Sequence, residues 1–280
     1  MQSKNKMMRT ILFTGLLLAI ACGAPNQESN VSQTVQELKI TPENHDQVMA
    51  EMFPAPTCDI HRIGILVYDG VNSLDVFGPR YVLAQMMGVQ VDLIAPDSGL
   101  VKTVMGIDFL ATTTMEEVDS LDILLIPGGF QGTIAATKDE RILSWIREMD
   151  QYTSFTAAVC TGGHILGASG LLKGKQATTN WYRAEEFLHK YEAEFTGTRW
   201  ARDGKYWTSA GVTAGMDMAL ALLAECYGEK YAQGVMLDME YAPDPPFPGG
   251  SPATTPPDVY QMMEAMYDMG FEATENMLNE

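Results

Sequence analysis

Residues 153–170 read T-S-F-T-A-A-V-C-T-G-G-H-I-L-G-A-S-G, and this stretch decides the fold class. Seven residues rich in β-branched and small side chains lead into Cys160, and a segment compatible with a helix follows at once. A strand that turns sharply into a helix projects the side chain of the turn residue out of the backbone. Free N–H groups at the helix N-terminus favour thiolate, so we expect a free Cys160 whose pKa is below the ordinary value of about 8.5. The alternative is that Cys160 is a small buried residue, as most free cysteines are.

Apolar runs that alternate with amphipathic segments surround this stretch. The runs expected to form strands are 63–67 (I-G-I-L-V), 89–95 (V-Q-V-D-L-I-A), 121–126 (L-D-I-L-L-I) and 206–209, and the expected helices are 73–87, 139–149, 181–191 and 214–227. This order predicts an α/β fold with a largely parallel sheet and helices on both faces. Ligands bind beyond the carboxyl ends of the strands in such sheets. Asp75, Gly128-Gly129 and Cys160 each follow a predicted strand, so we expect them to meet at that edge.

The composition of the 280 residues limits the kinds of partner. A formal net charge of −18 argues against nucleic acids and anionic membrane surfaces, because both are polyanions. The four histidines are scattered and the chain has no C-x-x-C pair, so we expect no metal site and no cofactor. The expected partner of the folded domain is a small-molecule substrate.

The N-terminus has the pattern of an export signal. Three basic residues precede the apolar run 11–20, which is too short to span a bilayer but fits a signal peptide over residues 1–21. The run ends in L-A-I-A-C at Cys22, which resembles the lipobox of bacterial lipoproteins, where cleavage leaves a lipidated cysteine at the mature N-terminus. The alternative is an ordinary secretory signal cut after Ala21. Both interpretations predict export, and the first predicts a periplasmic or cell-envelope lipoprotein anchored to the membrane.

The four cysteines divide unevenly between these roles. If Cys22 carries lipid, Cys58, Cys160 and Cys226 remain, an odd number for an oxidising compartment. At most one disulfide can then form, and a reactive Cys160 would have to stay out of it. Whether Cys58 pairs with Cys226 is left open by the sequence.

Three further segments follow the signal peptide. Residues 22–58 are expected to form a flexible tether with a short helix, and residues 59–252 the α/β domain. Prolines after Glu240 predict an extended arm, and residues 253–280 form an acidic, methionine-rich tail. Methionines at helical spacing in this tail predict a helix docked on its own domain or on a dimer mate, with a partner-binding helix as the alternative.

Several motifs of the chain together resemble those of the ThiJ/PfpI superfamily. They are G-I-L-V-Y-D-G-V-N-S-L-D-V-F-G-P (64–79), L-L-I-P-G-G (124–129), A-V-C-T-G-G (158–163), G-L-L-K-G-K-Q-A-T-T-N-W (170–181) and S-A-G-V-T-A-G-M-D-M-A-L (209–220). The resemblance implies a glutamine-amidotransferase-like, flavodoxin-like sandwich. Within the superfamily the chain looks most like the isocyanide hydratase branch, whose proline-rich ending is similar to residues 236–252.

The resemblance also implies catalytic roles and a reaction. Cys160 would be the nucleophile on its elbow, Asp75 the acid that shuttles a proton, and Thr161 a donor to the substrate or to Asp75. The implied enzyme is a homodimeric hydro-lyase that adds water to a small electrophilic carbon through a thioimidate-like intermediate on the cysteine.

An oxyanion-type site is implied by the same motifs. Backbone N–H groups at Gly129 and Thr161, with Gly128 and Val212 beside them, would bind the substrate and stabilise its developing negative charge. Without the resemblance, an acid such as Asp75 in a first helical turn would be assigned to the helix dipole instead.

Two residues depart from the family pattern. Asn180 stands where many members have histidine in T-T-H-W, so no cysteine–histidine pair is available there. His164 replaces the usual apolar residue one turn after Cys160, and we expect a partly buried helix histidine, with a place in the pocket as the alternative. Two other functions therefore stay open: a different enzyme of the superfamily, such as a glyoxalase, deglycase or amidase, and a non-catalytic ligand-binding or redox-sensing lipoprotein.

Overall fold

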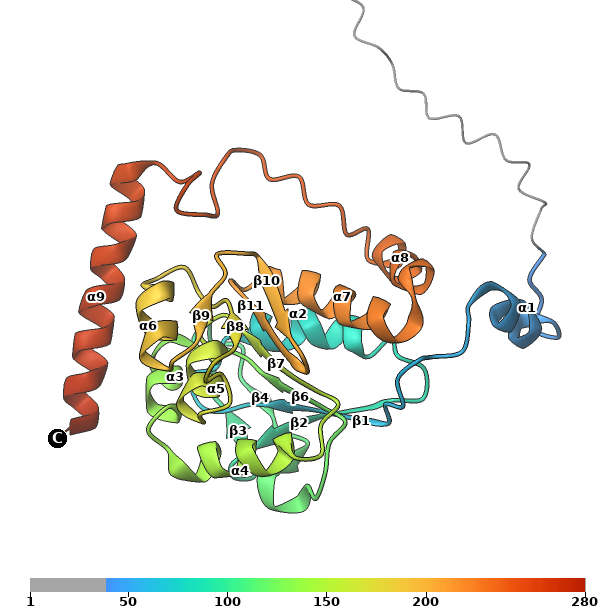
Figure 1. The fold of residues 1–280 in the computed structure, drawn as a ribbon, viewed down its shortest axis with the longest axis horizontal. Helices are drawn as coiled ribbons and strands as arrows, with labels where there is room; N and C mark the ends of the chain where they lie inside the picture. Colours follow the sequence, from blue (N-terminus) through green and yellow to red (C-terminus); the bar gives the residue numbers. More distant parts are fainter. Residues whose placement is uncertain (1–38, 280) are drawn as a thin grey trace, which may run out of the picture. The chain divides into compact units, whose positions relative to one another are not determined.

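The computed structural model describes residues 39–279 (Figure 1). The chain divides after Glu43 into an N-terminal unit, of which residues 39–43 are described, and the unit of residues 44–280 that carries the fold. The predicted signal peptide, residues 1–21, and the predicted lipidation site Cys22 lie outside the described residues.

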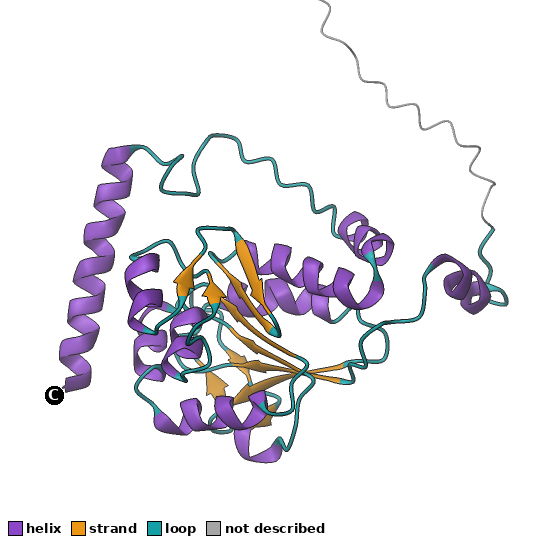
Figure 2. Cartoon of the chain, viewed as in Figure 1, coloured by secondary structure: helices purple, strands orange, loops and turns teal. Residues whose placement is uncertain are grey.

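A seven-stranded sheet forms the centre of the larger unit (Figure 2). Its order is β10-β11-β7-β6-β1-β2-β5, and neighbouring strands run parallel except for the pair β10 and β11. The strands are Arg62–Leu66 (β1), Gln90–Ala95 (β2), Thr113–Thr114 (β5), Ile123–Ile126 (β6), Phe155–Val159 (β7), Trp200–Asp203 (β10) and Tyr206–Ser209 (β11). Strands β6 and β7 are buried along their whole length, as expected for a sheet covered on both faces. The predicted α/β class is confirmed.

Helices cover both faces of the sheet (Figure 1). One face carries α2 (Ser73–Leu83) and α7 (Ala214–Tyr227), and α8 (Glu229–Asp238) packs on α7. The other face carries α3 (Phe130–Ala136), α4 (Glu140–Asp150) and α5 (Gly162–Ala168), and α6 (Ala184–Lys190) packs on α5. The apolar stripe of α4 explains its orientation, because Ile142, Leu143, Ile146 and Met149 are all buried.

Smaller elements complete the domain. They are the antiparallel hairpin of β3 (Leu100–Val101) and β4 (Phe109–Leu110), the parallel pair of β8 (Gln176–Ala177) and β9 (Glu194–Phe195), and the 3-10 helix η1 (Met115–Glu117). The hairpin turns around Met105-Gly106, where Gly106 has a φ of 73°.

Two helix boundaries differ from prediction. Helix α2 ends at Leu83, short of Met87, and a turn leads to Gly88 in the left-handed region at φ 76°. Helix α6 begins at Ala184 and not at Trp181, because Arg183 adopts a left-handed φ of 45°. Helices α3 and α8 are not predicted by the sequence analysis.

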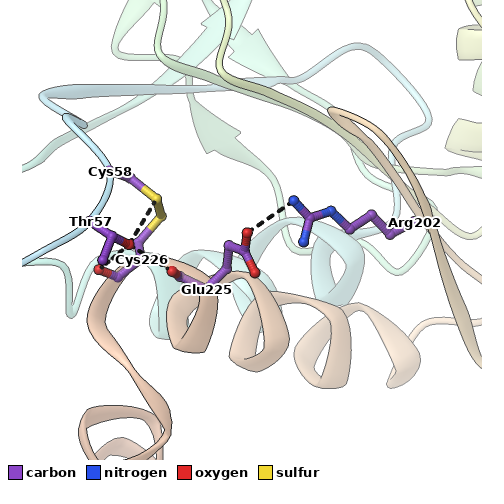
Figure 3. Close-up of a disulfide and its surroundings, with 5 residues drawn as sticks. All are labelled: Thr57, Cys58, Arg202, Glu225 and Cys226. Atoms are coloured by element: carbon purple, nitrogen blue, oxygen red, sulfur yellow. Dashed lines mark hydrogen bonds and ion pairs between the residues drawn. A yellow bond between two sulfur atoms is a disulfide. The ribbon is translucent and has the colours of Figure 1, made fainter.

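A disulfide between Cys58 and Cys226 joins the segment before β1 to α7 (Figure 3). The Thr57 N–H donates to the Cys226 carbonyl oxygen at 2.8 Å and reinforces this link. Helix α1 (His45–Met52) precedes the segment. The pairing leaves Cys160 as the free cysteine among the described residues, so the expected free thiol is confirmed.

The C-terminal part begins with an arm without helix or strand over residues 241–256, as its prolines predict. It leads to α9 (Pro257–Asn279), which contacts α3 on its own domain. The described segment 39–279 holds no helix that is both long and apolar enough to cross a bilayer.

Candidate active site

Cys160 sits on a strained turn between β7 and α5. Its φ of 57° lies in the left-handed region, which costs a non-glycine residue about 1–2 kcal/mol. Three backbone contacts hold this conformation: the Cys160 N–H donates to Ser209 O at 3.0 Å, and the Cys160 carbonyl accepts from Thr179 Oγ1 at 2.7 Å and from Gly163 N at 3.3 Å. The residue is 7% exposed. The predicted elbow is therefore present, and neighbouring segments maintain its strain.

Asp75 lies in the first turn of α2, which Asn72 caps by accepting from Leu74 N at 3.0 Å. Its carboxyl group is completely buried, and Oδ2 accepts from Gly128 N at 3.0 Å. The other oxygen, Oδ1, has no partner of ordinary hydrogen-bond geometry among the described residues. A Cβ at Gly128 would lie 2.6 Å from Thr161 Oγ1 and 2.9 Å from Asp75 Oδ2, so glycine is required where this loop passes between the two side chains.

The carboxyl group of Asp75 and the thiol of Cys160 perturb one another. Burial raises the pKa of Asp75 to about 7, against the smaller lowering by hydrogen bonds from Gly128 and Cys160. Burial also raises the pKa of the Cys160 thiol, and the charge of Asp75 raises it further. The predicted depression of the thiol pKa is therefore wrong: the Thr161 N–H and Asn180 do favour thiolate, but burial outweighs them. Near neutral pH the pair holds a protonated thiol beside a carboxyl group able to take or give a proton.

Thr161 takes part in a buried hydroxyl network. Its Oγ1 lies 2.9 Å from Thr133 Oγ1 and accepts from Gly129 N at 3.1 Å. Gly129 N also donates to Thr133 Oγ1 at 2.9 Å, and Tyr68 OH lies 3.2 Å from the same atom. The Thr161 hydroxyl is thus bonded to Gly129 and Thr133 and not to Asp75, one of the two partners expected for it, and donation to a substrate stays a prediction. Thr133 belongs to α3, a helix that the sequence analysis does not predict, so no sequence pattern points to this residue.

The backbone N–H groups expected to bind an oxyanion have different partners in the structure. The N–H of Gly128 is bonded to Asp75, and that of Gly129 to two threonine hydroxyls. The N–H of Thr161 interacts with the sulfur of Cys160 and lowers its pKa. Val212 is partly buried between β11 and α7 and packs on the core. Among the three N–H groups, that of Thr161 is the one that faces the nucleophile.

Asn180 and His164 occupy different surroundings. Asn180 is buried, and its Nδ2 donates to Cys160 Sγ at 3.4 Å, so it holds the position beside the thiol. His164 is 3% exposed and stacks on Phe187 with ring centroids 4.3 Å apart. Burial, with a smaller contribution from Lys190, lowers the pKa of His164 to about 3, so the ring is neutral at pH 7. It is more deeply buried than the sequence predicts.

Helix α9 brings aromatic residues to the site that sequence reasoning missed. Tyr267 lies 5.1 Å from Trp181 and 4.8 Å from Phe130, measured between ring centroids. Phe130 and Trp181 directly follow the site residues Gly129 and Asn180. Tyr260, Tyr267 and Phe271 are spaced by seven and four residues, a helical signal that the more numerous methionines obscured. Over the described range 39–279, no three His, Cys, Asp or Glu side chains are grouped to hold a metal ion.

Comparisons with known proteins identify the family of this chain. The model of the DJ-1/PfpI family matches residues 61–225. Isonitrile hydratase of Pseudomonas putida is 42% identical over 195 residues, which covers 70% of this chain and 85% of that protein. The HTH-type transcriptional regulator CdhR of Pseudomonas aeruginosa is 29% identical over 141 residues, 50% of this chain and 41% of the regulator.

Solved structures give the same result at the level of the fold. A THiJ/PfpI family protein from Pseudomonas syringae superposes with a TM-score of 0.76 at 31% identity, covering 87% of this chain and 98% of that one. Drosophila melanogaster DJ-1beta superposes with a TM-score of 0.60 at 21% identity over 66% of this chain and 100% of its own, which supports the fold alone.

The fold and the site define an α/β sandwich with a cysteine on a strand-to-helix elbow and a buried acid beside it. The chain belongs to the DJ-1/PfpI family.

Proposed function

We propose that this protein is a cysteine-dependent hydro-lyase that adds water to the terminal carbon of a small isocyanide. The main support for this proposal is the buried pair of Cys160 and Asp75, in which the acid has a pKa of about 7. Asn180, and not a histidine, lies beside the thiol, so Asp75 has no imidazole to replace it. The 42% identity to an isonitrile hydratase supports the choice of substrate class.

The first half of the proposed reaction moves a single proton from sulfur through the carboxylate to the substrate carbon. Asp75 takes the thiol proton of Cys160 as the sulfur attacks the terminal carbon of R–N≡C, and then delivers that proton to the same carbon. The product of this half-reaction is the thioimidate R–N=CH–S–Cys160. Water adds to its carbon while the nitrogen is protonated, the C–S bond breaks, and the thiol recovers its proton. The sum is R–NC + H₂O → R–NH–CHO.

The surrounding donors have supporting roles in this proposal. Thr161 N–H and Asn180 Nδ2 face the sulfur and would stabilise the thiolate as it forms. Gly128 holds Asp75 through its N–H, and Gly129 positions Thr161. Val212 is proposed as an apolar neighbour of the bound substrate, following the family resemblance.

A substrate panel tests the proposal. The purified mature protein and Cys160→Ala are offered alkyl isocyanides, glyoxals and simple amides, with formamide, hydroxyacid and ammonia as readouts. Isocyanide turnover that disappears in Cys160→Ala supports the hydratase. Turnover of glyoxal or amide instead assigns another reaction of the family, and saturable binding without turnover assigns a ligand-binding protein.

Export, lipid attachment at Cys22 and a cell-envelope location remain part of the proposal. The disulfide between Cys58 and Cys226 supports an oxidising compartment, because such bonds are rare in the reducing cytosol. Mass spectrometry of the mature N-terminus should detect diacylglyceryl-cysteine. An unmodified product that begins at Cys22 would exclude the anchor.

A homodimer is also proposed. Helix α2 exposes Leu74, Phe77 and Tyr81, and the β3–β4 hairpin exposes Met105 and Ile107. The rings of Phe77 and Phe109 lie 5.1 Å apart, which joins the two elements in one apolar surface. Light scattering on the purified protein distinguishes a dimer from a monomer.

A further inference from the structure

Helix α9 packs on the active-site side of the domain through aromatic rings. Tyr267 contacts Phe130, Trp181 and Tyr182 with centroid distances of 4.8, 5.1 and 5.0 Å. Phe271 stacks on Tyr182 at 5.2 Å and contacts Phe130 at 4.9 Å. Figure 1 shows the helix beside α3 and α6, at the far end of the arm that leads from α8.

Two further features fit α9 closely to this surface. A Cβ at Gly270 would lie 2.5 Å from Phe130 Cε1, so the absence of a side chain lets the helix approach the ring. Asp268 Oδ1 accepts hydrogen bonds from Tyr182 OH at 2.5 Å and from Arg183 Nη2 at 2.7 Å. The contact between α9 and the domain is therefore specific: Gly270 fits against the apolar ring of Phe130, and Asp268 provides a polar anchor.

Tyr267 of this helix contacts the ring of Trp181, the residue that follows Asn180. The charges of Cys160 and Asp75 both raise the pKa of the Tyr267 hydroxyl, after the larger effect of burial, and a hydrogen bond from Asn180 lowers it. These three partners are the site residues already described. Met266, the preceding residue, is 52% exposed and belongs to the outer face of the helix.

The thiol of Cys160 has little access to solvent in this structure. Cys160 is 7% exposed. Two cavities of about 360 and 270 Å³ lie elsewhere, the first beside Tyr68 and Asp97 and the second between α6 and α9, and Cys160 lines neither. A substrate that reaches the sulfur must therefore displace some of the side chains that bury it.

We propose that α9 is a lid over the thiol and that Tyr267 is the specificity-determining residue that limits the size of the substituent accepted beneath it. The arm of residues 241–256 lets the helix lift, because it holds no helix or strand. The face of α9 that packs on the domain is aromatic. It therefore suits a small apolar substituent R on the isocyanide nitrogen, the atom bonded to the reacting carbon. The effect of the lid on turnover rests on the proposed hydration reaction, whereas its control of access to Cys160 does not.

The lid is tested by thiol labelling, which needs no substrate. Iodoacetamide and a fluorescein maleimide report access of a small and a bulky reagent to Cys160, and Cys160→Ala gives the background. Gly270→Ala forces Phe130 and the helix apart, and Asp268→Ala removes the polar anchor. Each should raise bulky-reagent labelling about 10-fold, the factor that one lost charge-assisted hydrogen bond or a comparable packing loss implies. Met266→Ala is the matched control and should stay within about twofold of the wild type.

Tyr267 is tested in the same assay and in turnover. Tyr267→Ala should raise bulky labelling more than small-reagent labelling, while Tyr267→Phe, which keeps the ring, should stay near the wild type. If all variants with an unchanged circular dichroism spectrum label like Met266→Ala, the lid is excluded. If isocyanides are substrates, Tyr267→Ala should raise kcat/KM for a bulky isocyanide relative to methyl isocyanide, and an unchanged ratio would exclude its role in specificity. Absence of all turnover would overturn the proposed function and leave the labelling result valid.

Discussion

The side-chain amide of Asn180 donates a hydrogen bond to the sulfur of Cys160 across 3.4 Å. An amide can stabilise a thiolate but cannot accept its proton, in contrast to an imidazole at the same place. In the proposed mechanism, proton transfer from the thiol therefore falls to Asp75, the interacting group with a pKa of about 7. This division of roles leads to different predictions for the two residues.

Asn180→Asp should slow alkylation of Cys160. The substitution removes the donor and places a carboxylate near the sulfur, so the pKa of the thiol rises further and less thiolate forms at a given pH. A loss of about 10-fold or more in the iodoacetamide rate at pH 8 follows from the value of one hydrogen bond to a charged group. Asn180→Ala only removes the donor, so its alkylation rate should lie between those of the wild type and Asn180→Asp. Equal rates for all three proteins would show that the contact does not stabilise thiolate.

His164→Leu should make the protein less sensitive to acid without lowering turnover. The pKa of His164 is about 3 in the fold against 6.5 for the free side chain, so the unfolded chain binds more protons between these values. Stability that is present above pH 6.5 is therefore lost as the pH falls, by about 2 kcal/mol at pH 5. Urea unfolding at pH 5 and 8 measures the difference, with the exposed His189→Leu as control. A large loss of kcat in His164→Leu would contradict this structural role.

The fold could be predicted from local patterns, but the state of the site could not. Buried strands read as continuous apolar runs, and the edge rule for parallel sheets brings Asp75 and Cys160 together before any coordinates are known. The pKa of Cys160 depends on how completely distant segments exclude water, which no local pattern encodes. The docking of Tyr267 depends in the same way on a glycine at residue 270 that meets Phe130 only in the folded chain.

The disulfide between Cys58 and Cys226 should contribute substantially to stability and nothing to catalysis. It joins residues separated by 168 positions, and the chain-entropy model assigns about 5 kcal/mol to a loop of this length. Dithiothreitol should lower the urea midpoint of the wild type but not that of the double variant Cys58→Ser/Cys226→Ser. Turnover under mild conditions should be unchanged, because Cys160 is not part of the bond. An unaltered midpoint after reduction would mean that Thr57 and its neighbours hold the segment alone.

Asp75→Asn should lower kcat by about 10²–10⁴-fold, the usual contribution of a general acid–base group, while the fold is kept or stabilised. Burial raises the pKa of Asp75 from 3.8 to about 7, so the folded protein retains a proton that the unfolded chain loses between these values. The free energy of unfolding of the wild type therefore falls as the pH rises through this window, by about 4 kcal/mol at most. Asparagine carries no charge, and its amide oxygen can still accept from Gly128 N. The variant should be more stable than the wild type above pH 7.

Asp92→Asn is the matched control for this result. Asp92 is also buried, but its carboxylate is paired with Arg62 Nε at 2.8 Å and accepts from Gln90 Nε2 at 2.9 Å. Loss of that charge should destabilise the protein and leave kcat of the folded fraction unchanged. Urea unfolding and kcat against pH for both variants separate the two kinds of acid. If Asp75→Asn behaves like Asp92→Asn, the carboxyl group is structural and the proton must move through another group.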